Sequence, residues 1–222
     1  MLKTLPHTVD LTLLNEAQCS VPSVESKLTI NQPTGNFFYD SWEIKEEFKG
    51  TVWESLLNTL PLDIGEARII VLGNGTTYMS HTDIDDRYHL GIKGQYSFLI
   101  NIDDEKMYPT VADGQWYEMN TGLRHVAANF GSYDRVQLVI RKLLNNPTLE
   151  NYTTVTIKPI CENPRFEFDD LISPLLNKLN KVCLINDFTI LQDGVSFNLS
   201  ADAITRLDSI DRNKFNIQLC ET

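Results

Sequence analysis

The central part of the chain, from Ala67 to Arg141, alternates short β-branched and aromatic runs with turn signals. The run Arg68–Leu72 stops at Gly73-Asn74-Gly75, and further strand candidates follow at intervals of about 8 to 12 residues. These candidates are residues 76–79, 88–92, 96–102, 115–119, 126–130 and 135–141. The spacing is typical of an antiparallel sandwich, barrel or jelly roll, whereas a Rossmann-like fold would alternate strands with helices. We therefore expect a mainly β protein.

A helix is predicted immediately before this region. Thr51 and Glu54 have the spacing of a capping box, and apolar residues then recur at helical intervals up to Pro61. The first 40 residues mix short apolar pieces with prolines and a glycine, which indicates an irregular or extended segment over residues 1–40. Residues 41–147 are then expected to form the antiparallel β core, a sandwich, barrel or jelly roll, with its flanking helix.

A change of pattern after Asn145-Asn146-Pro147 indicates a second unit, over residues 148–222. The pattern there predicts strand 153–160, helix 168–180, strand 182–191, strand 195–199, helix 201–210 and strand 215–219. This β-α-β-β-α-β order is the split βαβ, or ferredoxin-like, arrangement. We expect a small α+β C-terminal domain.

The charge of the chain limits its partners. Thirty acidic residues against 19 basic ones give a formal charge of −11. Because binding to nucleic acid or anionic lipid depends on Lys and Arg, we expect neither a nucleic acid nor a membrane partner. The four cysteines lie far apart among aliphatic residues, and no apolar run is long enough for a secretory signal or a membrane span. We expect a cytoplasmic protein.

Candidate metal ligands lie in the β-rich region. In His81-Thr82-Asp83 the imidazole and the carboxylate are two residues apart, so both project to the same side of a strand. His125 precedes another strand, and a sheet folded back on itself could bring it to the same metal. Two histidines and one carboxylate leave coordination positions open, as in non-haem Fe(II) oxygenases. The alternative is that His81 and Asp83 are a surface or core pair without a metal.

A buried cation is predicted downstream of this group. Arg135 comes ten residues after His125 and opens an alternating strand that runs to Arg141. An arginine that points into a sandwich interior is costly to bury alone and pairs most naturally with a carboxylate. Arg141 shares the strand face with Arg135 and competes for this role, but the spacing from His125 favours Arg135.

The segment from about Arg68 to Arg141 resembles the aspartyl/asparaginyl β-hydroxylase and proline cis-hydroxylase group of 2-oxoglutarate oxygenases. The resemblance rests on the following blocks: His81-Thr82-Asp83, Asp86-Arg87-Tyr88-His89-Leu90-Gly91, Gly114-Gln115-Trp116-Tyr117, His125-Val126 with Asn129, and Asp134-Arg135-Val136-Gln137-Leu138-Val139. The presence of Asp83 matches the complete metal triad of the proline hydroxylases. The block at Gly114 departs from the G-E-x-W-type block of the group, which leaves the choice of substrate open.

The resemblance implies a double-stranded β-helix core, also called a jelly roll or cupin-like fold. It implies that His81, Asp83 and His125 bind Fe(II), and that Arg135 binds the distal carboxylate of the co-substrate 2-oxoglutarate. Arg87 and His89 are implied to lie in the same pocket, as further co-substrate residues. The implied enzyme uses dioxygen to hydroxylate a small-molecule or peptide substrate of the proline, aspartate or asparagine type.

The sequence also allows other functions and other roles for His89 and Arg87. A cupin-like metal isomerase or hydrolase would not use 2-oxoglutarate. Such proteins usually add a third histidine or a glutamate to the metal, so His89 on the metal would favour this alternative. A non-catalytic binding module on the same fold is a third reading. His89 is alternatively a buried, hydrogen-bonded residue, and Arg87 alternatively pairs with Asp85 or Asp86. The oligomeric state has no signal in the sequence.

Overall fold

The chain folds into two compact units, Met1–Leu143 and Leu144–Thr222, which are described here separately. The computed structural model describes residues 2–35, 37, 40–83, 85–102, 104–143, 152–160, 172–181, 185, 188–191 and 193–220. The predicted boundary at residue 147 lies outside these residues. In the part of the chain so described, no helix is long and apolar enough to cross a membrane.

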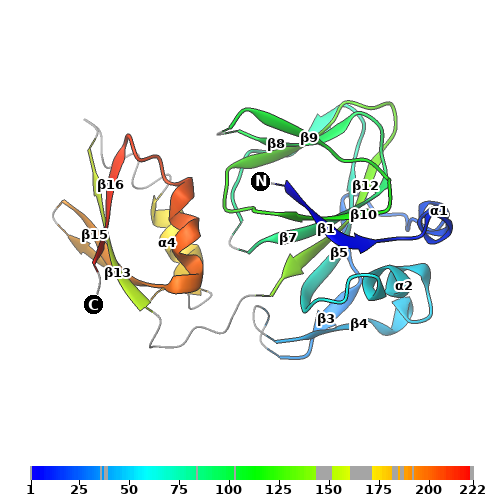
Figure 1. Cartoon of the computed structure of the whole chain (residues 1–222), viewed down its shortest axis with the longest axis horizontal. Coiled ribbons are helices and arrows are strands. Elements are labelled where there is room, and N and C mark those ends of the chain that lie inside the picture. The colour runs from blue at the N-terminus through cyan, green and yellow to red at the C-terminus, as the bar shows by residue number, and fades with distance from the viewer. Residues whose placement is uncertain are drawn as a thin grey trace. The chain divides into compact units, whose positions relative to one another are not determined.

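The first unit contains two antiparallel sheets of the predicted mainly β core (Figure 1). The major sheet has the order β1-β10-β7-β12-β5-β2, and the minor sheet has the order β6-β11-β8-β9. The strands of the major sheet are β1 (Leu2–Thr8), β2 (Lys27–Thr29), β5 (Ile64–Leu72), β7 (Arg87–Lys93), β10 (Gln115–Met119) and β12 (Arg135–Lys142). Those of the minor sheet are β6 (Thr76–Thr77), β8 (Ser97–Asn101), β9 (Lys106–Pro109) and β11 (His125–Asn129).

The remaining elements of the first unit lie beside the major sheet. They are α1 (Leu11–Cys19), the hairpin of β3 (Asn31–Pro33) and β4 (Trp42–Ile44), the short 3-10 helix η1 (Glu46–Phe48) and α2 (Val52–Asn58). The predicted helix after Thr51 is confirmed, but its capping differs. Glu54 accepts a hydrogen bond from the Gly50 amide (2.6 Å), and the Thr51 hydroxyl donates to the Phe48 carbonyl (2.6 Å). The turn of η1 immediately before the helix presents that carbonyl to Thr51, which therefore does not cap α2.

The central strands β7 and β12 of the major sheet are buried on both faces, and this positions the site. On the outer face, apolar side chains of the strands pack against α1 and α2 in one hydrophobic cluster, each contributing roughly 1.5–3 kcal/mol of stability. The cluster includes Leu14, Ala17, Trp53, Leu56, Ala67, Ile69, Leu90, Ile92, Trp116, Leu138 and Ile140. Because side chains alternate along a strand, the residues between these apolar positions point to the opposite, inner face. Arg68, His89 and Gln137 occupy that inner face.

The expectation of an irregular or extended segment over residues 1–40 did not include α1 or the pairing of β1 and β2 within the major sheet. β1 pairs with β10 at one edge of the major sheet, with Leu2 opposite Met119. β2 pairs with β5 at the other edge, and α1 packs into the core between them. The partners of both strands lie far away in sequence, so local patterning carries no signal for them. The edge strand β9 was not predicted either, because its short exposed run ends in a proline.

The second unit has the predicted α+β composition. Its elements are β13 (Tyr152–Pro159), α4 (Ser173–Lys181), β14 (Thr189–Leu191), β15 (Gly194–Ser200), the 3-10 helix η4 (Ala201–Ser209) and β16 (Phe215–Cys220). The antiparallel sheet order β14-β15-β13-β16 is that of the split βαβ arrangement. η4 replaces the predicted α-helix, and the predicted start of the preceding helix at residue 168 lies outside the described residues.

Candidate metal centre and its cavity

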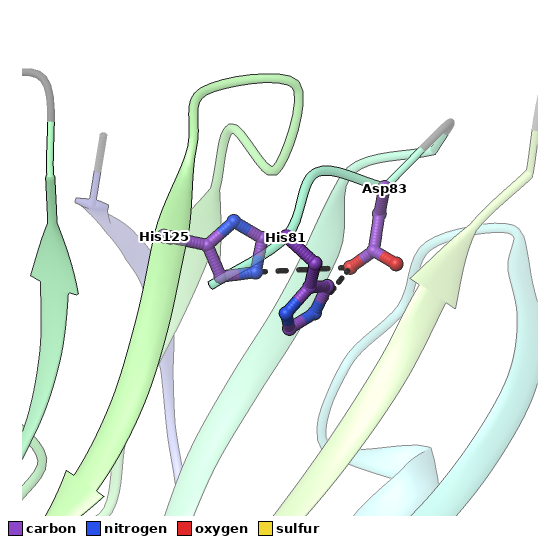
Figure 2. Close-up of side chains that lie close together, drawn as sticks. All are labelled: His81, Asp83 and His125. Carbon is purple, nitrogen blue, oxygen red and sulfur yellow. Dashed lines mark ion pairs between the residues drawn. The ribbon is translucent and has the colours of Figure 1, made fainter. Parts of the chain in front are cut away.

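His81, Asp83 and His125 lie together on the inner side of the first unit (Figure 2). His81 faces His125 across an isolated antiparallel bridge, in which each backbone amide donates to the other carbonyl, at 3.0 and 2.9 Å. The Nε2 atoms of His81 and His125 lie 3.9 and 3.8 Å from the Asp83 Oδ2 atom. One ligand atom from each residue lies within 4.8 Å of the others, so the three side chains converge on one point.

Backbone carbonyls orient both imidazoles. The His81 Nδ1 atom donates to the Met79 carbonyl (2.8 Å), and the His125 Nδ1 atom donates to the Leu123 carbonyl (2.9 Å). A carbonyl only accepts, so each Nδ1 carries a proton and each Nε2 is the nitrogen that faces Asp83. This second hydrogen bond is the usual feature of histidines that bind metals.

The protonation states suit a cation. Burial acts to raise the pKa of Asp83, but the nearby Arg87, His125 and His81 outweigh it and hold that pKa below its ordinary value. Burial lowers the pKa of His125, which keeps its imidazole neutral near pH 7. A divalent metal with bonds of about 2.0–2.2 Å accepts donor atoms up to roughly 4 Å apart, and the two imidazole Nε2 atoms lie 3.9 and 3.8 Å from the Asp83 Oδ2 atom. The donor set therefore fits a borderline divalent metal such as Fe(II).

The three residues open into a cavity of about 510 Å³ between the inner faces of the two sheets. The residues that line it are Ser26, Lys27, Arg68, Ile70, Tyr78, Met79, His81, Asp83, Arg87, His89, Leu99, Met119, Thr121, His125, Ala127, Arg135, Gln137 and Val139. All six site residues expected from the sequence, which are His81, Asp83, Arg87, His89, His125 and Arg135, are among them. The rival Arg141 is not.

Arg135 is buried, only 2% exposed, deep in this cavity. Its Nε atom donates to the Thr110 hydroxyl (3.2 Å), and its Nη2 atom donates to the Gln137 Oε1 atom. No carboxylate among the described residues pairs with it, and burial lowers its pKa to about 10. A guanidinium at that pKa is still charged near pH 7, so Arg135 is a buried cation that faces the cavity without a counter-ion from the described chain.

Gln137 also binds His89. Its Oε1 atom accepts from the His89 Nδ1 atom (3.1 Å), so the His89 Nε2 atom is the unprotonated nitrogen. That Nε2 atom is buried and has no hydrogen-bond partner in the described part of the chain. Burial lowers the pKa of His89 to about 3, which makes the ring neutral. Sequence reasoning missed Gln137, although its position two residues after Arg135 places both on one strand face.

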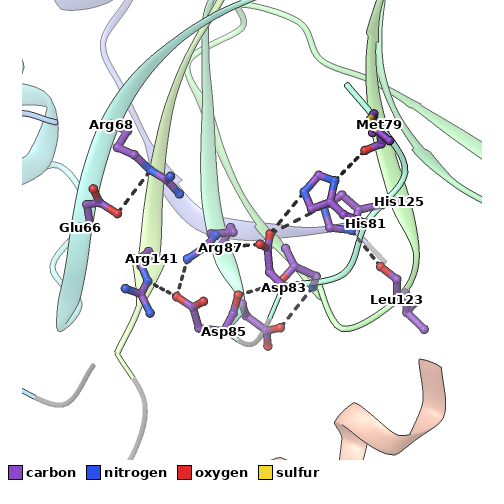
Figure 3. Close-up of polar contacts among 12 residues, drawn as sticks. Glu66, Arg68, Met79, His81, Asp83, Asp85, Arg87, Leu123, His125 and Arg141 are labelled. Atoms are coloured by element: carbon purple, nitrogen blue, oxygen red, sulfur yellow. Dashed lines mark hydrogen bonds and ion pairs between the residues drawn. The ribbon is translucent and has the colours of Figure 1, made fainter. Parts of the chain in front are cut away.

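An ion-pair network links Asp83 to Arg87, Asp85 and Arg141 (Figure 3). The buried Asp85 carboxylate accepts from Arg87 and from Arg141. Arg87 also lies 3.4 Å from the Asp83 Oδ1 atom, which leaves Oδ2 for the imidazoles. The guanidinium of Arg141 lies 4.3 Å from the centre of the Phe37 ring. Arg141 is thus engaged outside the cavity, which favours Arg135 as the residue that meets a ligand.

The part of the chain that carries the site is similar to a known protein family. Residues 48–143 match the model of the Aspartyl/Asparaginyl beta-hydroxylase family, and the predicted resemblance to that group is confirmed. No curated protein matches the chain. Among solved structures, the chain is similar to an oxidoreductase of the 2OG-Fe(II) oxygenase family from Burkholderia pseudomallei. The two are 13% identical with a TM-score of 0.45, over 63% of this chain and 82% of that chain.

Proposed function

We propose that this chain is an Fe(II)- and 2-oxoglutarate-dependent hydroxylase of an amino acid or an amino-acid residue. One observation carries the proposal: an oriented His–Asp–His donor set shares its cavity with the buried cation Arg135. His81, Asp83 and His125 would hold Fe(II). Arg135 would bind the distal carboxylate of 2-oxoglutarate through a charge-assisted pair. The family match over the same residues supports a hydroxylase.

The other residues of the cavity have roles that follow from their contacts. Fe(II) and 2-oxoglutarate, when bound, supply the oxidation of an unactivated C–H bond by dioxygen. Arg87 positions Asp83 through their ion pair and lies beside the co-substrate space. His89 presents its unpaired Nε2 atom to the same buried space. The apolar Leu99 and Val139 exclude water from the reacting groups.

The isomerase or hydrolase alternative would be favoured by His89 on the metal. In the described part of the chain, the group of metal-capable side chains holds His81, Asp83 and His125 without His89. His89 instead binds Gln137 through Nδ1. This contact weighs against the alternative.

Anaerobic spectroscopy tests the metal site. Fe(II) with 2-oxoglutarate should give the weak visible charge-transfer band of a chelated complex in the wild-type protein. His125→Ala should abolish the band, because one of three ligands is lost. His7→Ala is the matched control, since His7 lies on β1 and does not line the cavity. A band that persists in His125→Ala would remove this residue from the metal.

Two arginine variants test the co-substrate site. Arg135→Ala should raise the 2-oxoglutarate requirement about 10- to 100-fold while sparing metal affinity, because charged hydrogen bonds contribute roughly 1.5–3 kcal/mol. Arg141→Ala should leave the requirement unchanged. An equal loss in Arg141→Ala alone would transfer the role to Arg141. Screening free amino acids and peptides for stimulated succinate formation would then identify the substrate.

A further inference from the structure

The cavity carries more positive charge than the metal ligands and the proposed co-substrate account for. Four cations line it, namely Lys27, Arg68, Arg87 and Arg135, against the single carboxylate of Asp83. Arg87 is neutralised by its ion pairs with Asp83 and Asp85. Arg135 is assigned to 2-oxoglutarate in the proposed function. Lys27 has no carboxylate partner among the described residues, and Arg68 has the Glu66 carboxylate at 3.6 Å as its ion-pair partner.

Arg68 is incompletely satisfied within the protein. Its Nε atom is buried and makes no hydrogen bond with any described residue. The Glu66 Oε2 atom lies 3.6 Å from it, which is an ion-pair distance but too long for a hydrogen bond, and the Thr29 hydroxyl donates to the other carboxylate oxygen, Oε1 (2.9 Å). Figure 3 shows Arg68 and Glu66 side by side on β5. A buried, unsatisfied donor costs roughly 1–3 kcal/mol, which a ligand acceptor would recover.

Lys27 lies next to Arg68 at the edge of the major sheet. It pairs with Ile70 of β5, two register positions from the pair of Thr29 with Arg68 and therefore on the same face of the sheet. Its side chain is exposed and makes no ion pair with the described residues. The two cations thus share one side of the cavity, toward the outer strand β2. The charge of Arg68 also contributes to lowering the pKa of Asp83, so it lies within electrostatic reach of the metal ligands.

We propose that Arg68, assisted by Lys27, binds the free carboxylate of a small acid, so that the substrate is a free amino acid and not a residue inside a polypeptide. The assignment rests on the proposed function. A guanidinium fork matches a carboxylate in a bidentate manner, and the lysine adds charge without fixed geometry. Ile70 and Val139 border the inner face beside Arg68 and provide apolar contact for the carbon body. The cavity volume of about 510 Å³ is typical of small-molecule sites.

The test compares free acids with their amides. L-proline, L-aspartate and L-asparagine, each also as its α-carboxamide, are titrated calorimetrically into the anaerobic protein with Fe(II) and 2-oxoglutarate. At least one free acid should bind, and its α-carboxamide should bind at least tenfold more weakly. Arg68→Gln should weaken binding of the acid at least tenfold, and the exposed-site variant Lys27→Gln about two- to fivefold. The charge-transfer band and the 2-oxoglutarate requirement should be unchanged in both variants.

Lys93→Gln is the matched control, because Lys93 is an exposed cation at the end of β7 that does not line the cavity. The assignment is overturned if no free acid binds, or if acid and amide bind equally well. It is also overturned if a peptide with internal proline binds better than the free acids, or if Arg68→Gln raises the 2-oxoglutarate requirement. If the wild-type protein shows no charge-transfer band with Fe(II) and 2-oxoglutarate, that separate result contradicts the proposed function itself.

Discussion

Gln137 is the most informative single position for testing the site. Its Oε1 atom accepts from both Arg135 and His89, and the residue is 2% exposed. Gln137→Leu removes this shared acceptor while keeping the volume nearly constant. Gln137→Glu instead places a carboxylate against Arg135. The two variants therefore change stability and co-substrate binding in different ways.

The magnitudes follow from the two hydrogen bonds. Gln137→Leu leaves two buried donors unsatisfied, at roughly 1–3 kcal/mol each, so the free energy of unfolding should fall by about 2–6 kcal/mol. Gln137→Glu retains an acceptor for both donors, and its stability should stay within about 1 kcal/mol of the wild type. However, the new carboxylate would neutralise Arg135 and repel the co-substrate. We expect the 2-oxoglutarate requirement to rise about 10- to 100-fold, the equivalent of roughly 1.4–2.8 kcal/mol.

Urea unfolding of the metal-free protein measures the stability, and titration of the anaerobic charge-transfer band measures 2-oxoglutarate binding. Gln95→Leu and Gln95→Glu are the controls, because Gln95 is exposed. Wild-type affinity for 2-oxoglutarate in Gln137→Glu would refute the assignment of Arg135. Wild-type stability in Gln137→Leu would show that the shared acceptor contributes little.

Three further outcomes are expected. Arg141→Ala should destabilise the protein by about 1–3 kcal/mol in urea, because the buried Asp85 loses one of its two arginines. Since the pKa of His89 is about 3 when folded and 6.5 as the ordinary value, only the unfolded chain takes up this proton between those values, so stability falls as pH drops. Urea unfolding at pH 4 and pH 6 measures this dependence, and between these values the free energy of unfolding should fall by about 1.4 kcal/mol less per pH unit in His89→Phe than in the wild type. Gly91→Ala should lower the melting temperature, because its Cβ atom would lie 2.1 Å from the Val111 carbonyl oxygen.

Much of the fold follows from local patterning. β10 was predicted with its observed bounds, Gln115–Met119, because turn signals flank an alternating run. The six-element order of the second unit was also visible in the sequence. By contrast, β1 and β2 close the two edges of the major sheet through partners that lie far away along the chain. Short edge strands have too little periodicity of their own to predict such a pairing.

The residues of the candidate site also differ in whether the sequence alone indicates them. His81, Asp83 and His125 are predicted as metal ligands because their residue types and spacing suit a metal, and the structure brings the three side chains together. The contacts that organise them arise only between strands: Gln137 joins β12 to β7, and Asp85 binds two arginines. Glutamine and aspartate are common residues without a local signature. Their importance depends on burial and on partners that only the folded chain brings together.

The bridge between His81 and His125 determines which insertions in the sequence this site tolerates. Each histidine is located by pairing with the other backbone, so the distance between the donors does not depend on the length of the hairpins that connect them. Insertions at those hairpin turns should leave the donors in place. A one-residue slip within the bridge would instead turn one imidazole to the far face, since side chains alternate. The length of the connecting loops can therefore vary widely, but the backbone pairing of His81 with His125 must stay fixed.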